Sequence, residues 1–215
     1  MSARGYFITG TDTGVGKTFV TVRLTERARL RGHQVFAFKP IESGCQPPLG
    51  DDQRCLVEAA GCWQTGELGG VYQLALPAAP LVAATAALTA IDLGRITQAF
   101  RVGCARASYV LVEGAGGWRV PITSDVDMGG LAKALELPVL LVARATLGTI
   151  NHALLSVEAI LRDGCELAGV VLSQKPDDDT TLIDSNIEQI ARRVSVPVVA
   201  LDRDSRILDR FTWNT

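Results

Sequence analysis

The stretch FITGTDTGVGKT, from Phe7 to Thr18, combines the residue types that bind phosphate groups in proteins. An apolar run leads into a turn with three glycines, and Lys17 and Thr18 then open an amphipathic pattern. Glycines let the backbone approach an anion closely, and the N–H groups at the start of a helix point towards it. A lysine at this point neutralises phosphate charge, and a threonine hydroxyl is suited to binding Mg²⁺. The stretch therefore predicts a nucleotide-binding loop.

This loop departs by one residue from the usual pattern G-x-x-x-x-G-K-[ST]. The pattern places its first glycine at position 11, but the chain has Thr11 there, and the glycine is Gly10. We expect a variant phosphate loop whose turn is one residue longer on the strand side. The alternative is an ordinary strand–turn–helix with an exposed Lys-Thr pair. The loop residues predicted to bind the nucleotide are Thr13, Gly14, Val15, Gly16, Lys17 and Thr18.

Lys39 and Glu113 each follow an apolar run, in FKPIESG and YVLVEGAGG. Ligands of open parallel sheets bind at the carboxyl ends of strands, so both side chains are candidates for one site. Lys39 would face the phosphates or an acceptor amine, and a surface lysine is the alternative. Glu113 offers oxygen ligands to Mg²⁺, and a strand-end carboxylate in water is the alternative. The glycines after Glu113, Gly116 among them, let the backbone approach a nucleotide.

Two helix starts offer further polar groups. Asp51 and Asp52 open the pattern DDQRCLVEAAG, where acidic residues are favoured as caps. The segment LGTINHALLS, residues 147–156, opens another helical pattern, and unpaired N–H groups there can bind a carboxylate. A plain helix start without a ligand is the alternative for this second segment.

These residues need elements that bring them to one edge of a sheet. Six short runs are apolar nearly throughout, as strands covered on both faces should be: residues 6–9, 35–38, 109–113, 138–143, 168–173 and 196–201. Between them the spacing predicts helices over residues 17–31, 52–60, 80–88, 92–107, 128–135, 151–163 and 180–193. Several of these stop at or near a glycine, such as Gly32, Gly61 and Gly164. We therefore predict one doubly wound, mostly parallel α/β domain of the P-loop NTPase class over residues 1–215.

Composition argues against several classes of protein. The chain has 215 residues, 47% of them hydrophobic, and a formal net charge of -2, so we expect no nucleic-acid or membrane partner. No apolar run reaches the ~18–20 residues of a membrane span, and the N-terminus has no long apolar stretch typical of a secretory signal. Five irregularly spaced cysteines favour free thiols over disulfides or a zinc site. A cytoplasmic location is the expectation.

The loop GTDTGVGKT, with its displaced glycine, resembles that of the dethiobiotin synthetases, and the similarity covers about residues 6–200. The resemblance implies an ATP-dependent ligase of biotin biosynthesis that converts 7,8-diaminononanoate and CO₂ into dethiobiotin, with ATP as co-substrate and Mg²⁺ as cofactor. A carbamate of the diamine would attack the γ-phosphate, and the second amine would close the mixed carbamic–phosphoric anhydride into a ureido ring. The resemblance also implies a homodimer.

The family's functional residues correspond to matching motifs of this sequence. Lys17 and Lys39 would be catalytic. The residues that match the substrate site are Lys39, Ser43, Gly148, Thr149 and Asn151, the last three reaching the substrate's carboxylate across the dimer interface. The residues that match the metal site are Thr18, Glu113 and Asp52, with Asp51 as the alternative to Asp52.

The sequence departs from the family in its last third. Where the family often has an asparagine that recognises adenine, this chain has Ser173 and Gln174. We predict Ser173 as a nucleotide contact and a relaxed or altered nucleotide preference, because the donor–acceptor geometry differs. Asn186 replaces a tyrosine near the substrate tail, and ALDRDSR, residues 200–206, replaces the motif G-E-I-P.

Two other functions fit the same fold. A ParA/MinD-like nucleotide-switch ATPase usually has an extra lysine, in K-G-G-x-G-K, but residues 11–14 of this chain contain none. An enzyme that amidates a cofactor precursor with glutamine would normally need a glutaminase domain with a nucleophilic cysteine, for which the chain leaves little room. ATP hydrolysis that requires both diaminononanoate and bicarbonate distinguishes a dethiobiotin synthetase from a switch protein.

Overall fold

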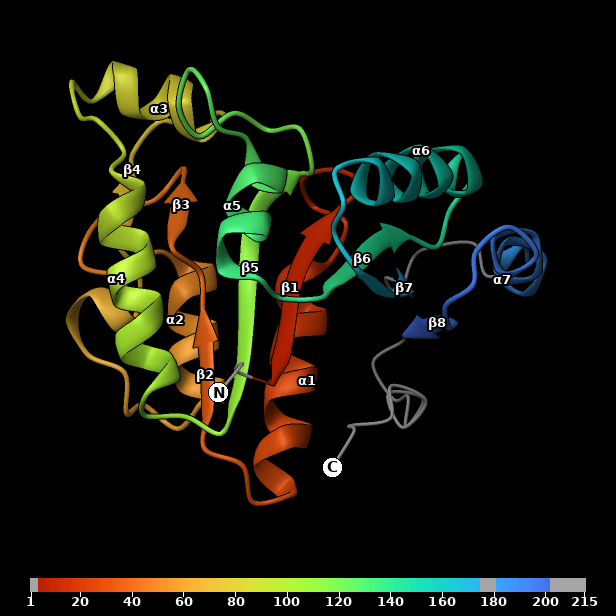
Figure 1. Ribbon diagram of the computed structural model, residues 1–215, viewed down its shortest axis with the longest axis horizontal. Coiled ribbons are helices and arrows are strands. Elements are labelled where there is room, and N and C mark those ends of the chain that lie inside the picture. The colour runs from red at the N-terminus through yellow and green to blue at the C-terminus, as the bar shows by residue number, and fades with distance from the viewer. Residues whose placement is uncertain (1–3, 175–180, 202–215) are drawn as a thin grey trace.

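The computed structural model describes residues 4–174 and 181–201, and its main feature is a six-stranded sheet between two layers of helices (Figure 1). In sheet order the strands are β2 (Val35–Phe38), β5 (Tyr109–Gly117), β1 (Gly5–Gly10), β6 (Val139–Arg144), β7 (Leu167–Ser173) and β8 (Val198–Leu201). Neighbouring strands are parallel throughout. From β1 the chain first reaches the edge strand β2, and β5 later lies between these two strands. The chain then winds outward on the other side of β1 through β6, β7 and β8, which confirms the predicted doubly wound α/β fold.

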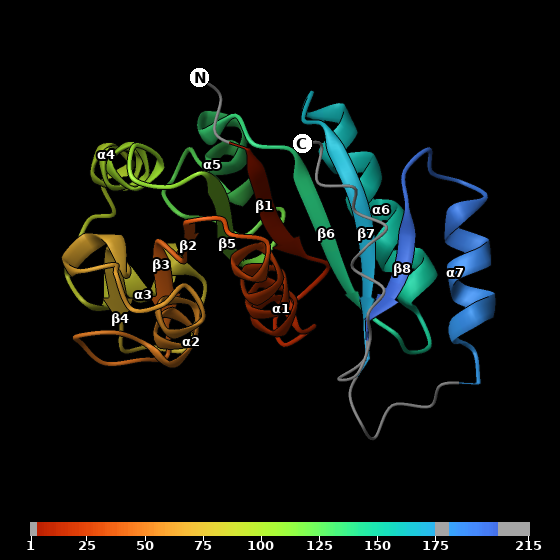
Figure 2. The same ribbon diagram turned by 90° about the horizontal axis from the view of Figure 1, so that it is seen from below.

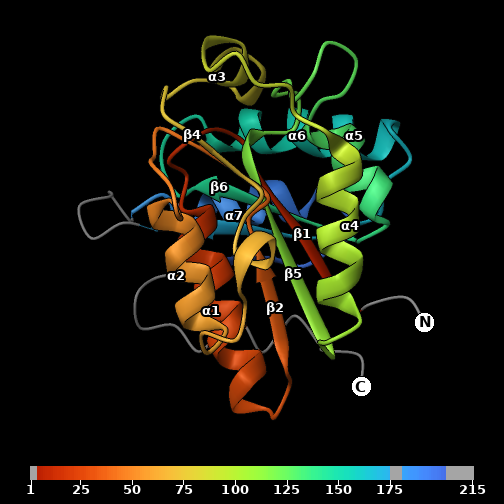
Figure 3. The same cartoon turned by 90° about the vertical axis from the view of Figure 1, so that its left-hand side faces the viewer.

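Helices cover both faces of this sheet, as Figures 2 and 3 show. One layer consists of α1 (Lys17–Leu30) and α2 (Asp51–Ala59). The other consists of α4 (Leu93–Cys104), α5 (Met128–Leu135), α6 (Thr149–Arg162) and α7 (Ile183–Ala191). Strand β2 shows why the strands are apolar throughout: Phe36 and Phe38 pack into one layer, and Val35 and Ala37 into the other. The sheet therefore has a hydrophobic core on each face.

Shorter elements lie beside the carboxyl end of β2. The strands β3 (Ile41–Ser43) and β4 (Tyr72–Leu74) form a second, parallel sheet, and a 3₁₀ turn, η1 (Gly66–Leu68), precedes β4. Helix α3 (Pro80–Ala86) lies above the carboxyl edge of the main sheet (Figure 1). Of these elements, β3 and α3 contribute residues to the lining of the site.

Side chains complete the hydrogen bonds at the β2 edge of the main sheet. Gln64 accepts the N–H of Ala37 at 3.3 Å and donates to the carbonyl of the same residue at 2.8 Å. Trp63 donates its indole N–H to the carbonyl of Val35 at 2.8 Å. The edge is thereby protected from pairing with another strand.

The six predicted strands and seven predicted helices are all present, with ends that differ by a few residues. Positive φ angles at Gly32, Gly61 and Gly164 confirm the predicted left-handed helix ends. The five cysteines are free thiols. Within residues 4–174 and 181–201, none of the helices combines the length and apolar character that crossing a membrane requires. The start of the predicted helix at residue 180 and most of the ALDRDSR segment, from residue 202, lie outside the described residues.

Candidate active site

The loop between β1 and α1 gives the displaced glycine a physical role. Thr11 donates its N–H to the carbonyl of Val142 at 2.9 Å, so pairing with β6 continues one residue past the end of β1. The Lys17 ammonium then folds back and donates to the carbonyl of Asp12 at 3.0 Å. A Cβ atom at Gly10 would lie 3.0 Å from this ammonium nitrogen and 2.7 Å from the Asp12 oxygen. Gly10 therefore leaves the space that the lysine needs.

Gly16 brings the end of β7 against the same loop. It precedes α1 with a φ of 99°, in the left-handed region that favours glycine. A Cβ atom at Gly16 would lie 2.2 Å from the Ser173 hydroxyl oxygen. Val15, the residue before Gly16, is buried in the hydrophobic core and anchors the loop there. Ser173 is thus next to the loop, where the sequence placed a nucleotide contact.

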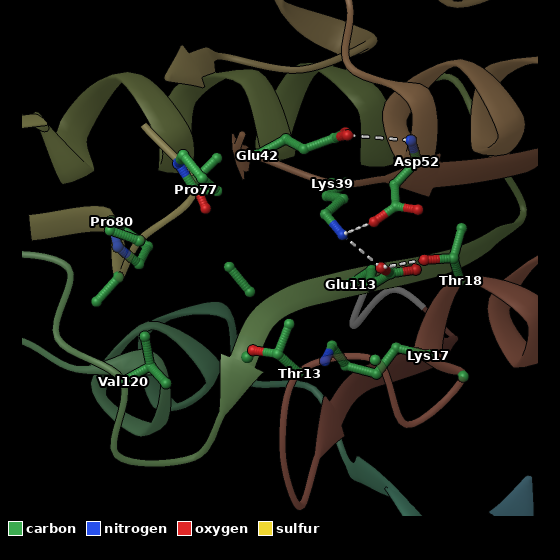
Figure 4. Close-up of a pocket in the computed structure, with 17 residues that line it drawn as sticks. Thr13, Lys17, Thr18, Lys39, Glu42, Asp52, Pro77, Pro80, Glu113 and Val120 are labelled. Atoms are coloured by element: carbon green, nitrogen blue, oxygen red, sulfur yellow. Dashed lines mark hydrogen bonds and ion pairs between the residues drawn. The ribbon is translucent and has the colours of Figure 1, made fainter. Parts of the chain in front are cut away.

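Four predicted residues from separate parts of the chain meet at the carboxyl edge of the sheet (Figure 4). The Lys39 ammonium contacts the Asp52 carboxylate at 2.5 Å and the Glu113 carboxylate at 2.7 Å. The Thr18 hydroxyl donates to the same Glu113 oxygen at 2.9 Å. Asp52 begins α2 and makes this contact, whereas the Asp51 side chain is 92% exposed and pairs with Arg54. Of the two aspartates, Asp52 is the one in the cluster.

Burial and charge shift the pKa values of this cluster in opposite directions. Burial lowers the pKa of Lys17 to about 8, although nearby Glu113 favours its charged form. Burial also disfavours the charged form of Lys39, but Glu113 and Asp52 outweigh it and raise the Lys39 pKa. Burial opposes ionisation of Asp52, and the Lys39 cation outweighs that effect and holds the Asp52 pKa below its usual range. Lys39 is therefore a fixed cation, while Lys17 titrates much nearer to neutrality.

The chemistry of the cluster fits a magnesium ion. Glu113 is fully buried, and its Oε2 atom has no hydrogen-bond partner among the described residues. Thr18 and Asp52 offer two further oxygens beside it. The described residues contain no group of three His, Cys, Asp or Glu side chains that would enclose a metal by themselves. Mg²⁺ is usually bound by one or two carboxylates together with substrate phosphates and water, and Glu113 and Asp52 are carboxylates of this kind.

The cluster forms one wall of a cavity of about 590 Å³, a size that suits a small-molecule ligand. Its polar wall includes ten of the predicted residues: Thr13, Gly14, Gly16, Lys17, Thr18, Lys39, Ser43, Asp52, Glu113 and Gly116. The opposite wall is apolar and is formed by Pro77, Ala78, Ala79, Pro80, Ala115 and Val120. Figure 4 shows Pro77, Pro80 and Val120 on the side away from Asp52 and Thr18. The cavity can therefore accept a ligand with a charged end and an aliphatic part.

Other predicted residues lie outside the cavity lining. Gly148 and Thr149 begin α6, where Thr149 is buried and its hydroxyl has no hydrogen-bond partner among the described residues. Asn151 is exposed, and Leu147 before this helix is 90% exposed. Asn186 is buried in α7 and is not part of the lining. Of the three predicted residues at the start of α6, Gly148 and Asn151 are therefore on the surface of this chain, and Thr149 is buried.

Sequence reasoning did not identify the apolar wall or Glu42. Pro77 to Pro80 lie in a loop and the start of a short helix, and no motif marks them as ligand contacts. Glu42 lies inside the FKPIESG segment that supplied Lys39 and Ser43. Its position between Lys39 and Ser43, just after the apolar run that ends at Phe38, is a signal that could have identified it as a site residue.

A glycine-rich loop that ends in Gly-Lys-Thr and joins the first strand to the first helix of a parallel α/β sheet is typical of the P-loop NTPase class of proteins. Two solved structures share this fold. MinD in the MinC:MinD complex from Aquifex aeolicus aligns with a TM-score of 0.56 at 16% identity, covering 97% of this chain and 85% of that one. The kinase domain of the Escherichia coli tyrosine kinase ETK aligns with a TM-score of 0.53 at 18% identity, covering 83% and 71%.

Sequence relatives define the family more closely. A family profile described as an AAA domain matches residues 4–201. The ATP-dependent dethiobiotin synthetase BioD of Anaeromyxobacter sp. (strain K) is 43% identical over 92% of this chain and 89% of its own length. The BioD of Xanthomonas oryzae pv. oryzae (strain PXO99A) is 37% identical over 92% of this chain and 89% of its own length. The BioD of Cellvibrio japonicus (strain Ueda107) is 38% identical over 94% of this chain and 90% of its own length. The chain belongs to the family of ATP-dependent dethiobiotin synthetases.

Proposed function

We propose that this enzyme makes dethiobiotin from 7,8-diaminononanoate, CO₂ and ATP in the cavity between Lys17 and Lys39, releasing ADP and phosphate. Membership of the dethiobiotin synthetase family supports the reaction. One structural observation supports its location: two buried lysines from different loops converge on one cavity with the carboxylate of Glu113 between them. Two cations beside oxygen ligands are the groups that phosphoryl transfer requires.

In the first half of the proposed reaction, one amine of the substrate takes up CO₂ and loses a proton to give a carbamate. A carbamate oxygen then attacks the γ-phosphorus of ATP, and the bond to the β–γ bridging oxygen breaks, so that ADP leaves. Backbone N–H groups of residues 13–18 hold the nucleotide, and Gly116 and Ser173 complete its site. Lys17 and Lys39 offset the negative charge that develops on phosphate and carbamate.

In the second half, the free amine attacks the carbonyl carbon of the mixed anhydride. Phosphate leaves with the electrons of the C–O bond, the amine loses a proton, and the ureido ring closes. Ser43 orients the diamine, and the apolar wall formed by Pro77, Pro80 and Val120 contacts its aliphatic chain. The protein thus acts mainly by positioning reactants and stabilising charge.

Thr18, Asp52 and Glu113 would hold Mg²⁺, which would offset part of the negative charge on the phosphates. In the chain without ligands, the Lys39 cation pairs with both carboxylates and offsets part of their charge. Lys39 therefore reduces the repulsion between the buried Glu113 carboxylate and the partly exposed Asp52 carboxylate before substrates bind.

The substrate's carboxylate is proposed to bind the partner subunit of a homodimer, at Gly148, Thr149 and Asn151. The start of a helix can offer N–H groups to an anion, and Gly148 and Asn151 are exposed on this chain rather than part of its own cavity. We propose that the enzyme works in the cytoplasm with neither a nucleic acid nor a membrane as a partner.

A mixing experiment tests the shared site. The variants Lys39→Met and Asn151→Ala are each expected to be weak enzymes. In a heterodimer of the two, one site carries both changes and the other carries neither. Random mixing should therefore restore about a quarter of the wild-type sites. A mixture no more active than the sum of its components contradicts the shared site.

The reaction itself is tested by isotope-labelled bicarbonate. We expect ATP hydrolysis only when diaminononanoate and bicarbonate are both present, with the labelled carbon recovered in the ureido carbonyl of dethiobiotin. Hydrolysis that ignores both compounds would identify a nucleotide switch instead and would refute the proposed reaction.

A further inference from the structure

Helix α2 begins without a capping side chain of its own. Gly50 is the residue before the helix and has no side chain to accept the first free N–H groups. The carboxylate of Glu42, in β3, accepts two of these N–H groups instead. Its Oε1 atom accepts the N–H of Asp52 at 3.1 Å, and its Oε2 atom accepts the N–H of Gln53 at 2.8 Å. Both carboxylate oxygens are thus used to hold the start of α2.

This contact is tightly packed. Glu42 is 7% exposed, and a Cβ atom at Gly50 would lie 2.2 Å from its carboxyl carbon. The absence of a side chain at Gly50 is therefore what lets the Glu42 carboxylate lie over the first turn of the helix. A carboxylate at this end is also favoured by the helix dipole.

Gln53 connects the same turn to the backbone of Lys39. Its side chain is fully buried, and its Oε1 atom accepts the N–H of Gly50 at 3.1 Å. Its Nε2 atom donates to the carbonyls of Lys39 at 3.1 Å and Tyr72 at 3.3 Å. The start of α2 is consequently fixed against the end of β2, and the Asp52 carboxylate meets the Lys39 ammonium.

We propose that Glu42 is a positioning residue, which holds the Asp52 backbone so that the Asp52 carboxylate faces the metal and phosphate site. The proposal rests on the function proposed above, in which Asp52 binds Mg²⁺. Glu42 acts through Asp52. Groups that orient a metal-binding side chain in this way typically change metal affinity or activity by ~10–100-fold when they are replaced.

The variant Glu42→Gln tests this with little change in size. The glutamine side chain has one carbonyl oxygen, whereas the Glu42 carboxylate has two oxygens. One of the two N–H groups at the start of α2 therefore loses its acceptor. We expect faster amide hydrogen exchange at Asp52 and Gln53, measured by NMR on the ligand-free protein. We also expect the Mg²⁺ dissociation constant to rise by about tenfold, measured by calorimetric titration of the complex with a non-hydrolysable ATP analogue.

A matched control is a helix cap that is not part of the cavity lining. The Asp92 carboxylate accepts the N–H of Gly94 at 2.7 Å at the start of α4. Asp92→Ala removes this cap and should lower the melting temperature, as Glu42→Gln should, but it should leave Mg²⁺ affinity unchanged. Equal effects of both variants on Mg²⁺ affinity would overturn the proposal, because loss of a cap alone would then account for them.

A double variant separates this proposal from the proposed function. Asp52→Asn should weaken Mg²⁺ binding, and adding Glu42→Gln should weaken it no further, because Glu42 acts only through Asp52. If Asp52→Asn weakens binding and Glu42→Gln does not, the role of Glu42 is wrong and that of Asp52 stands. If Asp52→Asn leaves Mg²⁺ binding unchanged, the metal role of Asp52 is wrong and both proposals fail at this residue.

Discussion

Replacement of Lys39 by methionine removes the cation between two carboxylates, and its effect on stability follows from their burial. The Lys39 side chain is 6% exposed and that of Glu113 is 0% exposed, whereas Asp52 is 41% exposed. Removing one partner of a buried ion pair costs ~3–5 kcal/mol, because the other charge is left without compensation. Because water screens the partly exposed Asp52 carboxylate, loss of its pairing with Lys39 contributes little to this cost. We expect the ligand-free variant to lose about 3 kcal/mol of unfolding free energy in urea titrations.

The same substitution should reduce catalysis independently of stability. Loss of one preorganised group that stabilises transition-state charge lowers kcat by about 100- to 1000-fold. The assay is dethiobiotin formation at saturating substrates and Mg²⁺, at a temperature where the variant is folded. Lys133→Met is the control, because Lys133 is exposed on α5 and has no contact with the cavity. It should change stability by less than about 0.5 kcal/mol and leave kcat unchanged.

The double variant Lys39→Met with Glu113→Gln separates the two effects. Because it leaves no unpaired buried charge, it should recover part of the lost stability. Its activity should stay as low as that of Lys39→Met or fall further. Near-normal turnover of Lys39→Met would refute the catalytic role of the lysine, and unchanged stability would refute the reasoning from the buried ion pair.

Three further predictions concern the nucleotide loop and its surroundings. Because burial lowers the pKa of Lys17 from 10.5 to about 8, the unfolded chain binds more protons between these pH values. The unfolding free energy of the ligand-free protein, relative to Lys17→Met, should therefore rise from pH 8 to pH 10.5 in urea titrations, and a fall would contradict the lowered pKa. Gly14→Ala and Gly16→Ala each place an alanine in the left-handed region, which should lower the unfolding free energy by ~1–2 kcal/mol. Only the new methyl group of Gly16→Ala also clashes with Ser173, which should lower the unfolding free energy by a further ~1–3 kcal/mol. If thermal unfolding shows that the two variants lose the same stability, the clash with Ser173 is contradicted. With Ser173 and Gln174 at the predicted base site, turnover with CTP, GTP or UTP should be comparable to that with ATP, and a large advantage of ATP at equal concentrations would exclude a relaxed preference.

Local patterns were enough to predict the main sheet and the loop. A buried parallel strand is apolar along its whole length, as Val35–Phe38 is, and a glycine-rich turn before Lys17 and Thr18 is typical of a phosphate-binding loop. The parallel alternation then places Lys39 and Glu113 at one edge without further information. The three-residue strands β3 and β4 were missed, because runs this short show no periodicity.

The contacts that position the site could not be predicted in the same way. Gln53 lies in an amphipathic helix, and its burial depends on carbonyl groups of β2 and β4, which are distant in sequence. The choice between Asp51 and Asp52 also depends on the direction in which α2 starts. Glu42 determines that start through two hydrogen bonds that span ten and eleven residues. Such contacts follow from tertiary packing, and no local propensity encodes them.

The central claim is that Lys17, Lys39 and the oxygen ligands beside them hold a triphosphate next to the carboxylated diamine. A crystal structure with a non-hydrolysable ATP analogue, Mg²⁺, diaminononanoate and bicarbonate tests it most directly. We predict the γ-phosphate within hydrogen-bond distance of both lysine ammonium groups, and the carbamate beside Lys39. A saturated crystal in which the triphosphate lies outside this cavity, or in which Lys39 points away from it, would contradict the account.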